Sequence, residues 1–195
     1  MSDFVYTIGH SNHSLDRLVQ LLTAHGVTAV ADVRSHPYSR FNPQFDRQRL
    51  ETDLGSAGLA YVFLGRELGA GPGDKACYVD GTAQYDLIAG TSLFQDGLAR
   101  LVRGSSSHRI ALMCAEKDPL TCHRAILVCR YLEIQGLGAQ HIHEDGQIES
   151  HEQALARLLT ELGFAEHDLF RSRNEMIVDA YQQRGKQIAY SEKAT

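Results

Sequence analysis

Short apolar runs alternate along the chain with longer segments that carry apolar residues at helical spacing. The runs span 4–8, 27–33, 60–64, 110–113 and 140–143. The first intervening segment has Ser14 as a candidate N-cap, leucines three and four residues apart, and Gly26 as a candidate terminator. This alternation predicts an α/β fold, a single three-layer domain over residues 1–195, with a largely parallel sheet of about five strands flanked by helices.

Two segments depart from this alternation. Residues 68–81 are rich in glycine and have neither helical nor strand period, so they predict a surface loop or a flap that covers a substrate. Residues 168–195 form a C-terminal helical extension with an amphipathic helix near 173–184. Between them, single helices are expected over 85–103 and 122–135, the second with Thr121 as its N-cap.

Composition narrows the class of protein. The chain has 195 residues, 43% hydrophobic and 22% charged, enough for one substantial core. A net charge of −5 argues against a surface built to coat nucleic acid, although it allows a local basic pocket. Four cysteines without a basic and apolar leader indicate a cytoplasmic protein with reduced thiols. No run of 18 apolar residues is present, so no membrane partner is expected.

Polar clusters follow four of the predicted strands. Because the carboxyl ends of parallel strands meet at one edge of a sheet, these clusters predict one shared crevice. The alternative is that these polar residues only mark the ends of buried strands, because any such strand must end in polar residues at the surface. The candidate site residues of this group are His10, Asn12, Arg34, Ser39, Arg66, Cys114 and Glu116.

The segment 114–124 concentrates reactive side chains after a strand and before a helix. At the helix start, Cys122 would be stabilised as a thiolate, assisted by His123 and Arg124, and could act as nucleophile, redox thiol or metal ligand. The alternative is an inert packed cysteine. Glu116 is the candidate acid or base, unless it forms a salt bridge, and His10 is the third catalytic candidate.

The ligand class follows from the guanidinium groups. Arg34, Arg66 and Arg124 near strand and helix ends suit phosphate or carboxylate, so an anionic small molecule or nucleotide is the expected partner, with nucleic acid as an alternative. Cys114 and His123 are expected to line the same substrate site. No cofactor is expected, and a metal ion at Cys114, Cys122 and His123 is the alternative. The chain has no GxGxxG, GxxxxGK[ST], GxSxG or HExxH motif.

Taken together, these motifs resemble a family of bacterial proteins called domain of unknown function 488. The resemblance implies a compact α/β domain and one site at the polar positions, and it supplies no substrate. The motifs that carry it are Thr7-Ile8-Gly9-His10-Ser11-Asn12, Asp32-Val33-Arg34 with Pro37 and Ser39, Leu64-Gly65-Arg66, Cys114-Ala115-Glu116, Cys122-His123-Arg124, Ala180-Tyr181 and Ile188-Ala189-Tyr190.

The leading hypothesis is an enzyme, a hydrolase or transferase, that acts on a phosphate-bearing, nucleotide-like or nucleic-acid-derived substrate. Arg34 and Arg124 would bind the anion, Glu116 would act as acid or base, and Cys122 would be the nucleophile. Two alternatives stay open. One is a non-catalytic nucleotide or nucleic-acid sensing module in which Tyr38, Phe41 and Tyr61 stack on bases. The other is a thiol-redox or metal-binding protein.

Overall fold

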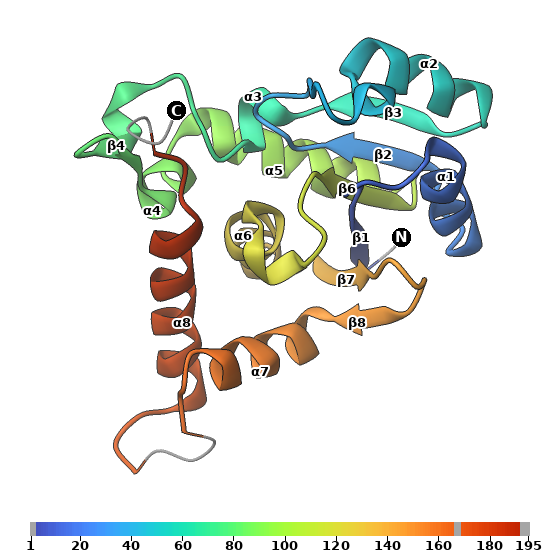
Figure 1. Ribbon diagram of the computed structural model, residues 1–195. Coiled ribbons are helices and arrows are strands. Elements are labelled where there is room, and N and C mark those ends of the chain that lie inside the picture. The colour runs from blue at the N-terminus through green and yellow to red at the C-terminus, as the bar shows by residue number, and fades with distance from the viewer. Residues whose placement is uncertain (1–2, 166–168, 192–195) are drawn as a thin grey trace.

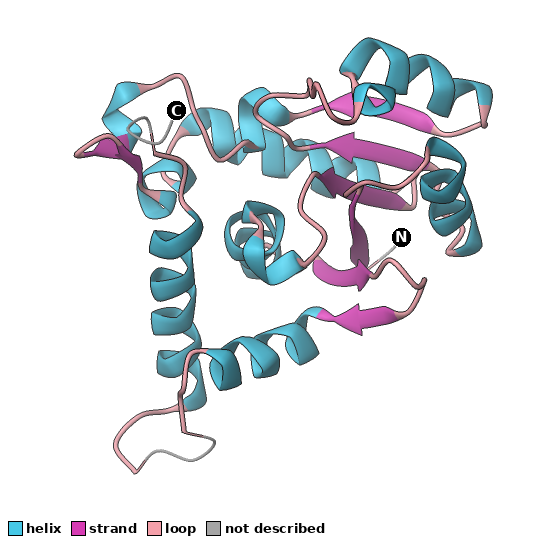
Figure 2. Cartoon of the chain, in the orientation of Figure 1, coloured by secondary structure: helices cyan, strands magenta, loops and turns pink. Residues whose placement is uncertain are grey.

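The computed structural model describes residues 3–165 and 169–191 and has a six-stranded sheet at its centre (Figures 1 and 2). The strand order is β3-β2-β6-β1-β7-β8, and every neighbouring pair is parallel except β7 and β8. The strands are β1 (Phe4–Gly9), β2 (Ala29–Asp32), β3 (Ala60–Phe63), β6 (Ile110–Cys114), β7 (Gly138–Ile142) and β8 (Ile148–Ser150). The predicted α/β fold is confirmed, and β8 adds an antiparallel edge strand to the five expected.

The register of the sheet aligns the ends of its three central strands. Strand β6 lies between β1 and β2, although it comes after both in the sequence. Gly9 pairs with Cys114, and Asp32 pairs with Met113. The residues that follow these strands therefore meet where the order of the strands reverses, which is the usual ligand position in an open α/β sheet.

Two separate apolar cores cover the two faces of the sheet. Along β1, Ile8 belongs to one core and Val5 to the other, as alternation along a strand requires. Helices α1 (Leu15–Ala24) and α2 (Arg47–Ser56) cover the face of Ile8. The face of Val5 is covered by α5 (Ser92–Ser105), η4 (Arg124–Cys129) and α6 (Arg130–Ile134). This is the predicted three-layer arrangement (Figure 1).

The helix predicted over 85–103 is two helices, α4 (Tyr85–Ala89) and α5. The chain breaks at Gly90, and the Thr91 side chain accepts a hydrogen bond from Phe94 N, which caps the start of α5. The single-helix prediction was wrong because the apolar spacing continues through this cap. None of the helices in residues 3–165 and 169–191 is long and apolar enough to cross a membrane.

The helix predicted to start at Cys122 also differs. Thr121 ends a 3-10 turn, η3 (Pro119–Thr121), in which the Asp118 side chain accepts a hydrogen bond from Leu120 N. Cys122 itself is extended, with φ −132° and ψ 140°, and its carbonyl oxygen accepts the first helical hydrogen bonds. A π-helical segment, η4, follows before the chain becomes α-helical in α6. Such segments are rare and occur frequently at functional sites.

The glycine-rich segment and the C-terminal helix come together beside the sheet. The segment contains the end of α3 (Gly65–Leu68), η2 (Lys75–Cys77) and β4 (Tyr78–Val79), which pairs with β5 (Thr82–Ala83). Helix α8 (Arg173–Ile188) runs from the end of α7 (His151–Glu161) to this hairpin (Figure 1).

The chain beyond α8 is held against the same hairpin. Ala83 N donates to the carbonyl oxygen of Tyr190 at 2.9 Å. The tail thus returns to the edge of the sheet where the polar clusters lie. Of the predicted C-terminal extension, Asp168 and residues 192–195 lie outside the described residues.

The remaining short element is η1 (Pro43–Phe45), between β2 and α2.

Candidate functional site

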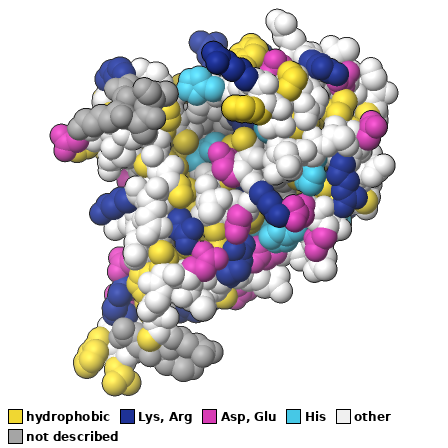
Figure 3. Space-filling model, viewed as in Figure 1, with side chains coloured by type: hydrophobic (Ala, Val, Ile, Leu, Met, Phe, Trp, Pro, Cys, Tyr) yellow, Lys and Arg dark blue, Asp and Glu magenta, His cyan; other side chains and the backbone are white. Residues whose placement is uncertain are grey.

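A cavity of about 260 Å³ opens at the carboxyl ends of β2 and β6, and we call it the thiol cavity. Its walls come from two strand ends, the loop near Gly71, the start of α4 and the chain after α8. Figure 3 shows histidine and apolar side chains gathered around a hollow on this face of the molecule. The lining residues are Arg34, Ser35, His36, Ala70, Gly71, Tyr85, Cys114, Ala115, Glu116, Thr121, Cys122, His123, Ile188 and Tyr190.

Two thiols and a carboxyl group meet in this cavity. The sulfur of Cys114 lies 3.0 Å from Oε2 of Glu116, and the sulfur of Cys122 lies 2.9 Å from the same oxygen. Strand β6 places Cys114, and the turn before η4 places Cys122. Both cysteines are buried, with 3% and 1% of their surface exposed. Only a small reagent can reach their sulfur atoms.

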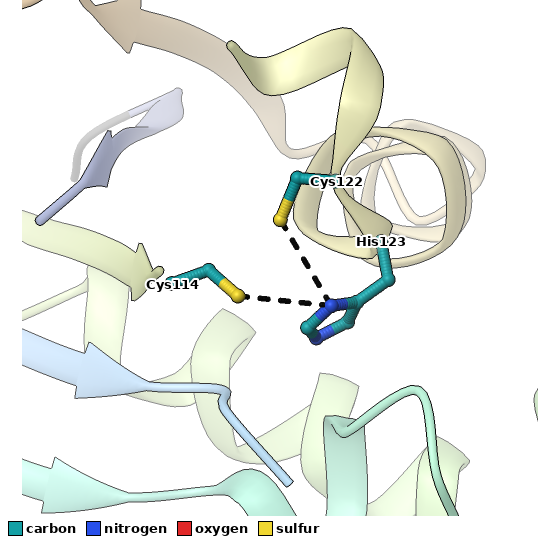
Figure 4. Close-up of side chains that lie close together, drawn as sticks. All are labelled: Cys114, Cys122 and His123. Carbon is teal, nitrogen blue, oxygen red and sulfur yellow. Dashed lines mark hydrogen bonds between the residues drawn. The ribbon is translucent and has the colours of Figure 1, made fainter. Parts of the chain in front are cut away.

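The imidazole of His123 completes the cluster and is oriented by the backbone. Its Nε2 lies 3.0 Å from the carbonyl oxygen of Val33, so Nε2 carries a proton and donates. Its Nδ1 then faces the two sulfurs, 3.7 Å from Cys114 and 3.9 Å from Cys122 (Figure 4). Burial lowers the pKa of His123, but the hydrogen bond and negative charge of Cys122 outweigh burial and raise it.

The pKa values of the two thiols are shifted in opposite directions. Burial opposes ionisation of Cys122, but the hydrogen bond from Cys114 and the charges of Arg124 and His123 hold its pKa well below the ordinary value. The hydrogen bond to Cys122 and burial raise the pKa of Cys114. Burial and the neighbouring Cys122 also raise the pKa of Glu116. These shifts favour a thiolate on Cys122 over one on Cys114, and they favour the protonated form of Glu116 and the charged form of His123.

Arg124 lies beneath the thiol cavity and holds the loop that carries Glu116. Its Nη1 donates to the Glu116 carbonyl oxygen at 2.6 Å, and its Nη2 donates to the Lys117 carbonyl oxygen at 3.0 Å. Its Nε donates to Oγ1 of Thr7 at 3.3 Å. The side chain is 1% exposed. None of these partners is a carboxylate, so the charge of Arg124 stays uncompensated by an acidic side chain among them.

Most N–H groups of the Arg34 side chain form hydrogen bonds within the protein. Its guanidinium is paired with Asp32, donating from Nε at 2.9 Å and from Nη2 at 2.7 Å, and Nη2 also donates to the Phe45 carbonyl oxygen at 2.8 Å. Its Nη1 lies 3.1 Å from Nε2 of His10. Burial and the Arg34 charge lower the pKa of His10 to about 4, so the neutral ring accepts this bond. One N–H of Arg34 Nη1 remains for a ligand.

A second cavity, of about 410 Å³, adjoins the first, and we call it the polar cavity. It shares Arg34, His36 and Ala115 with the thiol cavity. The two cavities therefore lie side by side along the sheet edge, and we refer to them together as the crevice. The lining residues of the polar cavity are His10, Ser11, Asn12, Arg34, His36, Tyr38, Ser39, Asn42 and Ala115.

The crevice gathers eight of the ten predicted site residues. Arg124 contacts the site from below without lining either cavity, and Arg66 is exposed on α3 and lines neither. The residues that sequence reasoning missed are Ser35, Tyr85 and Tyr190. The place of Ser35 in the site could have been predicted, since it directly follows Arg34 at a strand end. Tyr190 belongs to the tail motif Ile188-Ala189-Tyr190, which carried the family resemblance but no predicted role in the site. Tyr85 carried no signal, because it arrives from a distant segment through packing.

Among the described residues, Cys114, Cys122 and His123 also form a group that could hold a metal ion. Their ligand atoms lie within 4.8 Å of one another, and all three side chains are buried. Oε2 of Glu116 would supply a fourth donor, since it lies 3.0 Å and 2.9 Å from the two sulfurs. Thiolate and imidazole donors suit a soft or borderline ion such as Zn²⁺.

Comparison with known proteins yields one match. A family model described as domain of unknown function DUF488 matches residues 14–131, which is more than half of the chain. The matched region includes the strand end at Arg34 and the whole segment from Cys114 to Arg124. No curated protein and no solved structure matches this chain.

Proposed function

This chain belongs to the family described as domain of unknown function DUF488, and from that premise we propose that it is a thiol-dependent enzyme. It is a hydrolase or transferase that acts on a small anionic substrate in the crevice at the carboxyl ends of the strands. One observation carries the proposal. The sulfur of Cys122 lies 2.9 Å from Glu116 Oε2 and 3.9 Å from His123 Nδ1 inside the thiol cavity.

Cys122, His123 and Glu116 each have a separate role in the proposed reaction. Cys122 is the nucleophile, because a thiolate held beside an imidazolium attacks an electrophile far faster than a neutral thiol. His123 stabilises that thiolate, and the Val33 carbonyl oxygen holds its ring in place. Glu116 donates a proton to the leaving group, because its raised pKa favours the protonated carboxyl group.

The charge balance of the site supports an anionic substrate. Arg34 is neutralised by Asp32, and the His123 imidazolium is neutralised by the Cys122 thiolate. Arg124 adds a second positive charge beside the Cys122 thiolate, and its hydrogen-bond partners are hydroxyl and carbonyl oxygens rather than carboxylates. A buried charge acts strongly in a site of low dielectric constant. The polar cavity accommodates the rest of the substrate, with His10, Asn12 and Ser39 as binding residues.

Alkylation of the intact protein tests both parts of this proposal. The protein is treated with iodoacetamide or iodoacetate at pH 7 in the presence of a chelator, and peptide mass spectrometry locates the label. We expect Cys122 to react first, and Cys77 and Cys129 to stay unlabelled because burial raises their pKa values. We also expect iodoacetate to react faster, relative to iodoacetamide, with Cys122 than with free cysteine.

A matched variant completes the design. Cys129→Ser changes a buried cysteine of η4 away from the cavity and should leave the labelling pattern unchanged, whereas Cys122→Ser should abolish the fast reaction. If Cys122 reacts no faster than Cys77, the nucleophile assignment is wrong. If the ratio of the iodoacetate rate to the iodoacetamide rate equals that of free cysteine, the preference for an anion is wrong.

A second candidate function is a nucleotide or nucleic-acid binding module, and it is favoured by the loop before η1. Tyr38 and Phe41 are 64% and 92% exposed on either side of Arg40, and Tyr38 also borders the polar cavity. Exposed aromatic rings beside a guanidinium suit base stacking. Fluorescence anisotropy with a labelled oligothymidylate tests this function: salt-sensitive binding that is lost in Phe41→Ala would support it, and absence of binding at low salt would exclude it.

A further inference from the structure

Tyr85 opens α4 and places its ring beside the thiols. Its hydroxyl oxygen is buried and has no hydrogen-bond partner in the described residues, although the side chain lines the thiol cavity. Only 9% of the residue is exposed. Buried hydroxyl groups are almost always hydrogen-bonded in proteins, because an unmet donor is unfavourable away from water. A donor of this kind, on a side chain that lines a cavity, is available to an acceptor on a ligand.

The neighbouring helix makes room for this ring. Gly185 lies inside α8, where alanine would favour the helix more. A Cβ at this position would lie 3.3 Å from Cδ2 of Tyr85, a tight contact. The absence of a side chain at Gly185 thus keeps the Tyr85 ring in position at the cavity wall.

The surroundings of the Tyr85 hydroxyl group keep it protonated, so it remains a hydrogen-bond donor. Burial raises its pKa, and so does the neighbouring cluster of Cys122, Cys114 and Glu116, because negative charge on that cluster disfavours the phenolate. These charges act on the hydroxyl because it lies near the same cluster across the cavity. At neutral pH the group is therefore protonated and able to donate one hydrogen bond to an acceptor beside Cys122.

We propose that Tyr85 donates a hydrogen bond to the carbonyl oxygen of an ester or thioester substrate whose carbonyl carbon Cys122 attacks. This inference rests on the proposed function of Cys122 as a nucleophile. A single spare donor fits the one oxygen atom of a carbonyl group. A phosphoryl group presents three such oxygens, and the guanidinium of Arg34 has only one N–H left for a ligand.

The step balances without any other reactant. The Cys122 sulfur forms a bond to the carbonyl carbon, and the π electron pair moves to the carbonyl oxygen, which accepts from the Tyr85 hydroxyl. The pair then returns, the bond to the leaving group breaks, and that group leaves with its electron pair and a proton from Glu116. Water hydrolyses the resulting thioester: its oxygen bonds to the carbonyl carbon, the bond to sulfur breaks, the carboxylic acid and the Cys122 thiolate are released, and the remaining proton of the water returns to Glu116.

The test separates an attack that forms an oxyanion from one that does not. Acylation by p-nitrophenyl acetate forms a tetrahedral oxyanion, whereas alkylation by iodoacetamide at the same sulfur does not. In Tyr85→Phe we expect acylation of Cys122 to slow by about 10²-fold, the usual effect of removing one oxyanion donor. We expect alkylation to change by less than about twofold. Tyr131→Phe, which removes a hydroxyl bonded to Asp86, should change neither rate.

Stability provides a second measurement. Because the Tyr85 hydroxyl has no partner to lose, Tyr85→Phe should unfold at the same temperature as the wild type or higher. A clear loss of stability would overturn the inference, since it would mean that the hydroxyl is bonded within the protein. Acylation at the wild-type rate in Tyr85→Phe would also overturn it while leaving the nucleophile in place.

Two further outcomes identify which claim has failed. If neither reagent modifies Cys122 in the wild-type protein, the proposed function fails and the inference fails with it. If iodoacetamide labels Cys122 and the protein releases p-nitrophenol from p-nitrophenyl phosphate but not from the acetate ester, the nucleophile stands and the carbonyl assignment is wrong.

Discussion

Gly9→Ala should damage the fold and the site through a single contact. Gly9 ends β1, and a Cβ built on it would lie 1.9 Å from the carbonyl oxygen of Glu116. Real Cβ atoms do not approach closer than 3.0 Å, so the loop must move by more than 1 Å. The same carbonyl oxygen accepts the 2.6 Å hydrogen bond from Arg124. Relief of the clash therefore breaks the bond that holds Glu116 in the thiol cavity.

The magnitude follows from these two effects. Overpacking of a close contact costs about 1–3 kcal/mol, and loss of a hydrogen bond to a charged donor costs about 1.5–3 kcal/mol. We expect the free energy of unfolding of Gly9→Ala to fall by the sum of the two, about 2.5–6 kcal/mol. We also expect slower alkylation of Cys122, because the Glu116 carboxyl group moves with its backbone.

Urea unfolding followed by circular dichroism measures the change in stability. Gly55→Ala is the matched control, because Gly55 lies in α2 and a Cβ added there would meet no atom within 4 Å, so this variant should be more stable by up to about 1 kcal/mol. A loss below about 1 kcal/mol in Gly9→Ala would refute the argument. So would a large loss of stability with an unchanged alkylation rate.

Two more predictions concern buried polar groups. Arg124→Lys keeps the charge but cannot reach Thr7 Oγ1 and both carbonyl oxygens together, so it should lose about 3 kcal/mol of stability and slow alkylation of Cys122. Exposed Arg100→Lys is its control in urea unfolding, and equal losses in the two variants would contradict the prediction. Burial lowers the pKa of His151 from 6.5 to about 4, so the unfolded chain binds the extra proton between these pH values. Stability should therefore fall as the pH drops below 6.5, and His151 should contribute about 2 kcal/mol of that loss at pH 5. His151→Phe should make the free energy of unfolding less dependent on pH between 7 and 5, whatever its effect at pH 7, and an unchanged slope would contradict this.

The two arginines that suggested anion binding play different parts in the structure. Arg34 pairs with Asp32 and positions the neutral His10, and Arg124 ties the loop of Glu116 to Thr7 on β1. Both shape the site through bonds to protein acceptors. The charge of Arg124 still acts on Cys122, whose pKa it lowers, because electrostatic attraction does not require a free N–H group.

The sequence by itself determined the order of the strands and helices and the edge of the sheet at which the reactive side chains gather. The apolar runs at 4–8 and 110–113 became β1 and β6 because buried parallel strands need continuous apolar side chains. The placement of His10, Arg34 and Cys114 at one edge followed from the direction of parallel strands. These properties depend on local patterning, which a single sequence records.

Only the tertiary structure decided which side chains meet, and at what distance. The sheet order places β6 between β1 and β2, so Gly9 lies against the Glu116 loop and Val33 orients His123. Helix packing brings Tyr85 and Tyr190 to the thiols from distant segments. Such contacts depend on long-range pairing and on the filling of space between layers, neither of which leaves a periodic signal in the sequence.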